Sequence, residues 1–549
     1  MKKLKWIFLP TMLAAILLLL VVSCRESFVQ EPISDLSTNT EEMIKWNDLL
    51  NQFDLSRDII IVQKEESIQE AVDAAKPGDA IYIEPGTYRE ALKINKDNIK
   101  LIGLTGPANE KVIIENPGGV QKCVSTTNGK NVEIVNIVPK NFSDAGLKIT
   151  QKCMPNPVGK SRLLNMKRSE LPGGIAHYEF ELRMGDGPFD VVGIHRVVKE
   201  YKPYHSVKTN GDIFMVHGGI MDFNSNFLIA GATNINAKTS SPVYLASKNI
   251  DVWGIDLGWT KVPVETTDFS FMKGWGVEKD INHTLAAMSF SRLVRGISSQ
   301  NYDKMNLLAF ANLVTICYGA AGKETQIPSC LHNIKGLIPI DEELICSDEE
   351  WVHAFREETC NSAEVYKEMI ENGIYQDNLG TTFNYFAELA LTEPEAKSPI
   401  FEGMTNYEAI MVIGTMTSPN QHFVGGNLNG LFYSDLTRFI NGLYSLKPYQ
   451  PAQEFYEYAV CSCNKENVVS FDDYVGNIKL PIFYIGAGGG VGAVGIYSTT
   501  LTSSTDITTL VVSVTDDKSV DYGIADLNMG NNSDKLVWEP LRKWLVDHN

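Results

Sequence analysis

The chain has 549 residues, 44% of them hydrophobic, and carries a formal net charge of −19. A chain of this length and apolar content can bury more than one core, so we expect two or more domains. The acidic surface that this charge predicts disfavours anionic lipid and nucleic acid as binding partners. We therefore expect no nucleic acid partner.

The first 24 residues have the features of a bacterial export signal. Lysines follow the initial methionine, and an apolar stretch runs from residue 6 to residue 22. The segment Val21-Val22-Ser23-Cys24 resembles the lipobox of bacterial lipoproteins, in which the cysteine thiol is lipidated and becomes the new N-terminus. This resemblance implies lipidation at Cys24 and attachment to a membrane through the lipid. The alternative is an uncleaved membrane anchor, because the stretch approaches the length needed to span a bilayer.

Either alternative places the mature chain outside the cytoplasm, at the cell membrane, behind a polar linker over residues 25–54. Removal of Lys2, Lys3 and Lys5 with the signal, residues 1–24, changes the formal charge from −19 to −22. The cysteines that remain beyond Cys24 could pair in an oxidising compartment. Their pairing cannot be read from the sequence.

Short apolar strands and one short helix follow from residue 55 to residue 150. Ser67 and Glu70 form a capping box at the start of an amphipathic helix, and the Pro-Gly pair that ends at Gly78 terminates it. The sequence Pro85-Gly86-Thr87-Tyr88 comes next. These phrases resemble the N-terminal turns of pectate-lyase-like right-handed β-helices. About four turns are predicted, too few for the groove of a polysaccharide lyase, so carbohydrate binding here is a minor alternative.

From about residue 170 to the C-terminus, buried apolar strands alternate with helical stretches, which predicts an α/β fold with a doubly wound sheet. The strands are predicted over residues 212–217, 249–256, 305–310, 336–341, 480–486 and 507–514, and the helices over 277–298 and 534–547. The segment between the strands at 336–341 and 480–486 is far longer than a loop. We therefore predict a helical cap over residues 345–475, and the cysteines that flank it are the best candidates for disulfides.

The strand at 305–310 runs directly into Ala311 and a helix. A strand, a sharp turn and a helix form the setting of a nucleophile elbow, and the earlier strand at 212–217 ends in His217-Gly218-Gly219. The whole stretch from about residue 170 resembles the α/β-hydrolase superfamily, specifically its lipase-like members. The resemblance implies an oxyanion hole built from the backbone N–H groups of Gly219 and Asn312.

The residues that this family uses for catalysis are replaced in this chain. Ala311 stands where the family has the nucleophilic serine, and Ile524 stands where it has the catalytic histidine. Alanine has no heteroatom to attack and isoleucine has no proton to exchange. Asp341 is a possible acid. The sequence has no Gly-x-Ser-x-Gly and no histidine between His422 and His548, so the chemistry has not moved a few residues away.

Two further motifs are given ordinary roles. Cys317 lies nearly two turns into the helix after the elbow, where a small buried hydrophobic side chain is expected rather than a substitute nucleophile. The glycine-rich run over residues 486–492 has no Lys-Ser/Thr after it, so phosphate binding is not expected. We expect no cofactor and no metal.

The leading hypothesis is a catalytically silent hydrolase-like protein at the cell envelope. It would use the retained pocket to bind an apolar or acyl small molecule, or a partner protein. The alternatives are an ester hydrolase that uses non-triad residues such as Asp341, and a carbohydrate-binding protein that acts through residues 55–150.

Overall fold

The computed structural model describes residues 59–104, 110–127, 129–150, 162–299, 301–415, 423–464, 469–489 and 492–549. The predicted signal, the linker and the predicted lipidation site Cys24 lie outside these residues. Within the described ranges, no helix is both long and apolar enough to cross a membrane.

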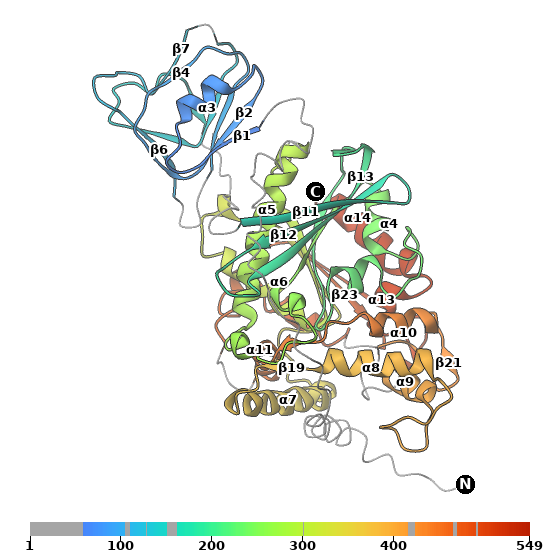
Figure 1. The fold of residues 1–549 in the computed structure, drawn as a ribbon. Helices are drawn as coiled ribbons and strands as arrows, with labels where there is room; N and C mark the ends of the chain where they lie inside the picture. Colours follow the sequence, from blue (N-terminus) through green and yellow to red (C-terminus); the bar gives the residue numbers. More distant parts are fainter. Residues whose placement is uncertain are drawn as a thin grey trace, which may run out of the picture.

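Residues 59–150, which we call the coil segment, form short strands that all pair in parallel (Figure 1). One sheet contains β1 (Ile59–Val62), β2 (Ala80–Ile83), β5 (Lys100–Gly103), β8 (Glu133–Val135) and β10 (Ile149–Thr150). A second contains β3 (Gly86–Tyr88), β6 (Val112–Glu115) and β9 (Ile137–Lys140), and a third pairs β4 (Leu92–Ile94) with β7 (Val124–Thr126). Successive turns of the chain therefore stack on one another.

The helix α3 (Ile68–Ala74) covers the first turn of the coil segment. As the capping box predicts, the Ser67 hydroxyl oxygen accepts a hydrogen bond from the Glu70 N–H. Apolar side chains that alternate along the strands, such as Ile81, Leu101 and Ile134, fill the inside of the coil. The handedness of the coil and its relation to pectate lyases stay predictions.

The rest of the chain, which we call the sheet unit, is built on a ten-stranded sheet in the order β11-β12-β13-β16-β15-β17-β18-β23-β24, with β14 paired to β13. Within this order, β16, β15, β17, β18, β23 and β24 pair in parallel, whereas β11, β12 and β13 pair antiparallel to their neighbours. Their bounds are β11 Arg162–Leu171, β12 Ile175–Arg183, β13 Val191–Lys202, β14 His205–Ser206, β15 Asp212–Val216, β16 Asp251–Asp256, β17 Met305–Phe310, β18 Ile334–Ile340, β23 Ile482–Ala487 and β24 Ile507–Val512. The sheet begins at Arg162, ahead of the predicted start near residue 170.

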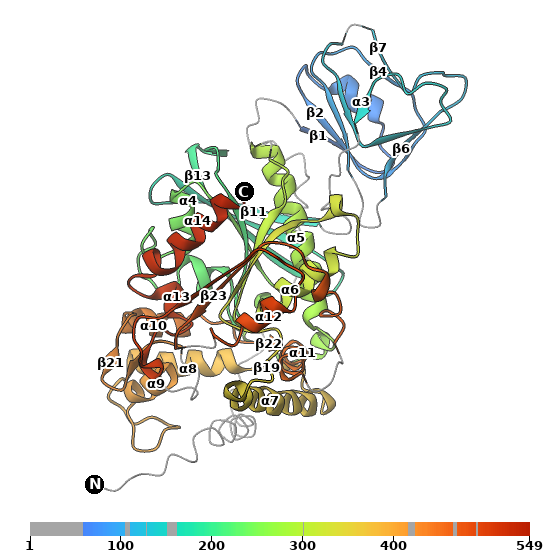
Figure 2. The same cartoon turned by 180° about the vertical axis from the view of Figure 1, so that it is seen from behind.

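Helices cover both faces of this sheet (Figure 2). The long helix α5 (Val277–Ser299) and α6 (Val314–Glu324) pack on one face and share its apolar core. The helices α4 (Ser241–Ser247) and α14 (Glu539–Asp547) pack on the other face, whose apolar core includes Ile213 and Trp538. The remaining short helices are α12 (Ile496–Thr500) and α13 (Asp526–Met529). The predicted doubly wound α/β sheet is confirmed.

The insertion between β18 and β23 is helical and lies at one end of the sheet (Figure 1). We call its helices the cap: α7 (His353–Glu371), α8 (Leu379–Thr392), α9 (Asn406–Thr415), α10 (Leu436–Tyr444) and α11 (Ala452–Cys463). Short strand pairs connect them, namely β19 (Gln376–Asp377) with β22 (Gln450–Pro451) and β20 (Gly426–Asn427) with β21 (Gly430–Leu431).

One disulfide joins two of the cap helices. Cys360 of α7 and Cys463 of α11 are bonded, with their Cα atoms 4.9 Å apart. The cysteines Cys123, Cys317, Cys346 and Cys461 are free and buried. The pair therefore comes from inside the predicted insertion, and it fixes α7 and α11 to each other.

The coil segment contacts the sheet unit through a small apolar cluster. Tyr82 and Val135 of the coil pack near Leu293 of α5 and Tyr302, and the hydroxyls of Tyr82 and Tyr302 are hydrogen-bonded. This contact lies at the end of the sheet unit that is remote from the cap (Figure 2).

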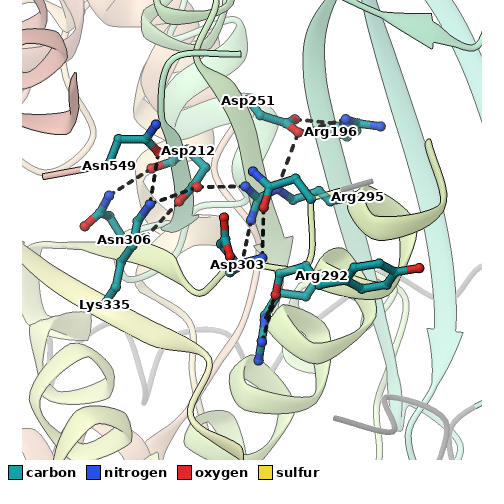
Figure 3. Close-up of polar contacts among 11 residues, drawn as sticks. Arg196, Asp212, Asp251, Arg292, Arg295, Asp303, Asn306, Lys335 and Asn549 are labelled. Carbon is teal, nitrogen blue, oxygen red and sulfur yellow. Dashed lines mark hydrogen bonds and ion pairs between the residues drawn. The ribbon is translucent and has the colours of Figure 1, made fainter. Parts of the chain in front are cut away.

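A buried ion-pair network fixes the amino ends of the parallel strands (Figure 3). Arg196 binds Asp251 through two hydrogen bonds of 2.9 and 2.7 Å, and Arg295 binds Asp212 at 2.7 Å. Lys335 also reaches Asp212, with its Nζ 3.1 Å from Oδ2. Asp212 and Asp251 are the first residues of β15 and β16. The network therefore lies at the amino ends of the parallel strands, whereas Ala311 lies at their carboxyl ends. We assign it a structural role.

Candidate functional site

Ala311 adopts the strained backbone of a nucleophile elbow. It follows the last residue of β17 directly, begins a short 3-10 turn that ends at Leu313, and leads into α6. Its φ is +55°, in the left-handed region that residues with a Cβ adopt at a cost of about 1–2 kcal/mol. This is the geometry that exposes a nucleophile above an α/β sheet. The backbone therefore keeps an elbow without a serine and without the flanking glycines.

The segment from His217 to Ile220, which we call the oxyanion loop, lies beside this elbow. A Cβ added at Gly218 would lie 3.4 Å from the Cβ of Ala311 and 3.1 Å from the ring of Phe310. His217 is fully buried, and burial lowers the pKa of its imidazole. Its Nε2 accepts a hydrogen bond from the Leu257 N–H at 3.3 Å, so this imidazole supports the loop.

The chain's own side chains occupy the space in front of the oxyanion loop. The Gly219 N–H donates to Oδ1 of Asn312 at 3.0 Å, and the Ile220 N–H donates to Oε1 of Gln450 at 2.8 Å. A Cβ added at Gly219 would lie 2.7 Å from the first oxygen and 2.9 Å from the second. Two amide oxygens thus accept hydrogen bonds from the N–H groups of Gly219 and Ile220, and the first of these is a predicted oxyanion-hole donor.

The sequence predicted Gly219 and Asn312 as oxyanion-hole donors, and the structure places them together. It adds that the Asn312 side chain is the acceptor for Gly219 and that Gln450 of the cap takes part. Both side chains are buried, Gln450 completely. Sequence reasoning missed Gln450 because nothing in its local pattern points to a partner that lies 230 residues away.

The cap closes directly on the oxyanion loop. The Lys447 N–H donates to the carbonyl of Ile220 at 2.7 Å, and the Lys447 ammonium lies 2.6 Å from Oδ2 of Asp222. Together with Gln450, these contacts bind the segment between α10 and α11 to the residues that follow β15. The loop is therefore held from both the elbow side and the cap side.

Ile524, at the position where the resemblance predicts a histidine to be replaced, is a buried apolar side chain. It belongs to the apolar cluster against which the half-buried Ala311 also packs. Asp526, two residues later, accepts hydrogen bonds from the N–H groups of Gly425 at 2.7 Å and Gly523 at 2.9 Å. Burial raises the pKa of Asp526 to about 6. The carboxylate of this loop therefore holds the cap backbone.

Asp341, the possible acid, directly follows β18 and is fully buried. Its Oδ1 accepts a hydrogen bond from the Ala487 N–H, and its Oδ2 has no hydrogen-bond partner among the described residues. Burial raises the pKa of this carboxyl well above its usual range. Asp341 is therefore packed against β23, where burial favours the protonated form of its carboxyl. Its role in catalysis stays a prediction.

A second buried polar cluster, which the sequence did not indicate, supports the chain after the oxyanion loop. Nε2 of His177 lies 2.9 Å from Nδ1 of His195, and Nε2 of His195 lies 3.0 Å from Oδ2 of Asp256. Although burial alone would raise it, His195 and Lys261 hold the pKa of Asp256 well below its usual range. The other oxygen of Asp256 accepts the Phe223 N–H at 2.9 Å. The cluster therefore positions the turn that follows the loop.

Cys317 is a buried side chain, as expected. Burial raises the pKa of its thiol to about 12, and its Sγ donates to the Leu307 carbonyl at 3.5 Å. In the part of the chain that the structure describes, no group of three or more His, Cys, Asp and Glu side chains is arranged to hold a metal ion.

No protein-family model matches this chain, and no curated protein matches it. Solved structures with a similar fold include a candidate lipase from Sulfolobus solfataricus, at 18% identity and a TM-score of 0.48 over 70% of this chain and 99% of that one. They also include a monoglyceride lipase from Saccharomyces cerevisiae, at 11% identity and a TM-score of 0.34 over 70% and 95% of the two chains. A monoacylglycerol lipase from Paleococcus ferrophilus gives 10% identity and a TM-score of 0.35 over 63% and 97%.

The fold itself is that of an α/β hydrolase. The mixed sheet with its parallel strands, the helices on both faces and the left-handed residue between β17 and α6 are all present. The elbow lies at the carboxyl ends of the parallel strands, where ligands bind in open α/β sheets.

Proposed function

We propose that this protein is a catalytically silent α/β-hydrolase-like protein that binds an apolar or acyl ligand at the former catalytic site, outside the cytoplasm. The observation that carries the proposal is the occupied oxyanion loop. Asn312 and Gln450 already accept the N–H groups of Gly219 and Ile220, next to an elbow that has no nucleophile. A hydrolase without its nucleophile and base retains only the help of its oxyanion donors, and here the Gly219 donor is used internally.

The apolar character of the site supports a ligand with an apolar or acyl chain. Both replaced triad positions, Ala311 and Ile524, contribute to one apolar cluster, and Phe423 packs against both this cluster and the core of the cap. The rings of Phe383 and Phe423 are 5.8 Å apart in an edge-to-face contact, and both are only partly buried. Ligand sites are mostly apolar with a few polar groups, which this lining resembles.

The activity half of the proposal is tested with short-chain aryl esters and a fluorophosphonate probe. We expect no turnover above background and no covalent labelling of the protein, because Ala311 offers no oxygen to acylate. A burst of product, or a labelled peptide from the elbow, would favour an active ester hydrolase.

The binding half is tested by displacement of a fluorescent fatty acid. Ile524→Asp would place a carboxylate in the apolar cluster and should weaken binding of the probe at least about tenfold. The control is Ile507→Asp, because Ile507 is exposed on the edge strand β24. Equal affinity of both variants for the probe, with folding verified by circular dichroism, would show that the ligand binds elsewhere.

Membrane attachment is proposed on the lipobox-like segment that ends at Cys24. The Cys360–Cys463 disulfide supports an oxidising compartment, where such bonds persist. Cys24→Ala should abolish incorporation of radiolabelled fatty acid. Attachment that persists with residues 1–24 uncleaved would instead favour the membrane anchor.

For residues 55–150 we propose a truncated right-handed β-helix that spaces the sheet unit from the anchor. Its parallel strand pairing supports this assignment. Carbohydrate binding by this segment remains the minor alternative, and a glycan array with the purified protein distinguishes the two.

A further inference from the structure

The cap helix α11 rests on the sheet unit through two pairs of carboxyl groups. At its N-terminal end, Glu454 is hydrogen-bonded to Asp280 of α5, and both side chains are buried. Farther along the same helix, the Tyr458 hydroxyl lies 2.8 Å from Glu342 and 3.2 Å from Glu343, the residues that follow Asp341 after β18.

The second pair is joined to α11 by a further contact. The Ser462 hydroxyl donates to Oε1 of Glu343, and the carboxyl groups of Glu342 and Glu343 are themselves hydrogen-bonded. We call Asp280–Glu454 and Glu342–Glu343 the two acid pairs. Each contributes side chains to the contact between the cap and the sheet unit.

Among the described residues, Asp280, Glu343 and Glu454 form no ion pair with a lysine or arginine. Lys279 adjoins Asp280 in sequence, but its ammonium binds Asp190 and lies 4.3 Å from the ring centre of Trp275. Two touching, buried carboxyl groups cannot both be ionised at low cost. Each acid pair therefore holds at least one proton while α11 is in place.

We propose that the protons held within the two acid pairs latch α11 to the sheet unit, and that their loss above neutral pH loosens α11 and frees the oxyanion loop. Gln450 transmits the change. Its Nε2 donates to Oε2 of Glu454 at 3.2 Å, while its Oε1 accepts the Ile220 N–H at 2.8 Å. The disulfide makes α7 move with α11. The proposal rests on the proposed function only in that the covered site binds a ligand.

The direction of the pH dependence follows from the buried state of the acids. Burial raises the pKa of Asp280 and that of Glu343 to about 7, and raises the pKa of Glu454 well above its usual range. A loosened cap would return these groups to water and to pKa values near 4. The closed state therefore binds more protons. The stabilisation of the closed state over the loosened state by these protons is complete below about pH 4 and is lost as the pH rises through about 7.

Other charged or titratable groups surround the two pairs. The elements packed against α11 and the helix itself contribute Glu278 and Lys279 from α5, Glu457 from α11, Arg356, Glu358 and Tyr366 from α7, Asp377 from β19, and Asp472, which contacts Cys461. Arg356 is engaged by the Cys463 carbonyl and by Asp348, so it does not neutralise either pair. Glu457 is half-buried and Glu358 is exposed on α7; partial desolvation raises the pKa of both carboxyl groups, so they act in the same direction.

The experiment is hydrogen–deuterium exchange on the full chain in detergent micelles between pH 5.5 and 8.5, corrected for intrinsic exchange. Each proton released on opening changes the opening equilibrium tenfold per pH unit. For peptides from α11 and from the oxyanion loop, we expect the opening equilibrium constant to increase between tenfold and about a hundredfold for each pH unit from pH 5.5 to 7. Peptides from β17 should not change. Protection of α11 that is independent of pH would overturn the proposal.

Variants assign the effect to the pairs. Glu454→Gln keeps a hydrogen-bonding side chain without a charge. It should reduce the slope of the opening equilibrium against pH by about one proton, that is, by a factor of about ten per pH unit. Asp280→Asn should do the same, which keeps the test valid if one variant does not fold. Glu364→Gln is the control, because Glu364 is exposed on α7. An unchanged slope in both test variants would overturn the proposal, whereas failure of fatty-acid binding alone would count only against the proposed function.

Discussion

Replacing Ala311 by glycine tests whether the elbow stores backbone strain. The left-handed φ of +55° costs an alanine about 1–2 kcal/mol, and glycine avoids this cost. Glycine loses about 0.5–1 kcal/mol more conformational entropy on folding, so the free energy of unfolding should rise by about 0.5–1 kcal/mol. Ala309→Gly is the matched control. Ala309 lies fully buried inside β17, so glycine there loses a buried methyl as well as entropy and should destabilise by about 1.5–2 kcal/mol.

Urea unfolding followed by tryptophan fluorescence measures this difference. The chain has no tryptophan between residues 47 and 252, so the signal reports the sheet unit and not the coil segment. The two variants should differ by about 2–3 kcal/mol, with opposite signs relative to the unmodified protein. If Ala311→Gly destabilises as much as Ala309→Gly, residue 311 does not occupy the left-handed region and the assignment of the elbow is wrong.

Two other contacts give predictions of stability. Replacing both Cys360 and Cys463 by serine opens a loop with a sequence separation of 103 residues, and should lower the free energy of unfolding by up to about 4.7 kcal/mol; an unchanged urea midpoint would contradict this. Asp212→Ala removes the buried carboxylate that both Arg295 and Lys335 bind and should cost about 3–5 kcal/mol, whereas Glu278→Ala, which removes an exposed pair with Lys323, should cost less than about 1 kcal/mol. Equal losses in these two variants would show that the network in Figure 3 is not buried as described.

The parts of the fold that follow from local sequence were predicted well. The apolar run at 305–310 and the helix after it identify the elbow, because the buried strand and the sharp turn are encoded in adjacent residues. The strands β15, β18, β23 and β24 were found for the same reason. The segment over residues 345–475 was predicted to be helical, and the helices α8 and α9 lie within it.

Ser347 and Glu350 also have the spacing of a capping box, which predicts from the sequence that a cap helix begins there, and this prediction is wrong. The N-cap of α7 is Val352, which has no side-chain cap. Ser347 is buried in the turn that follows β18, so tertiary packing has overridden a local signal there.

The site depends on contacts that no local pattern encodes. Gln450 and Ile220 are 230 residues apart, and Gly219 and Asn312 are 93 residues apart. An amide side chain in either place looks like any other polar residue in the sequence. The pairing of Asp280 with Glu454 was likewise invisible, since two acids on separate helices predict repulsion until burial forces them to share a proton.

The contacts around the oxyanion loop also bear on whether the proposed inactive site could be made catalytic by changing the triad positions alone. A serine lost recently would leave the loop's N–H groups facing an open pocket, and Ala311→Ser with Ile524→His would then restore the hydrolase. Here the N–H groups of Gly219 and Ile220 are bound by amide oxygens from two different elements, one of them in the cap. An ester carbonyl would have to displace the Asn312 amide oxygen before it could accept the Gly219 N–H, and losing one oxyanion donor costs about 10²–10³ in rate. The elbow keeps its strain, but the surroundings now favour a closed site over a reactive one.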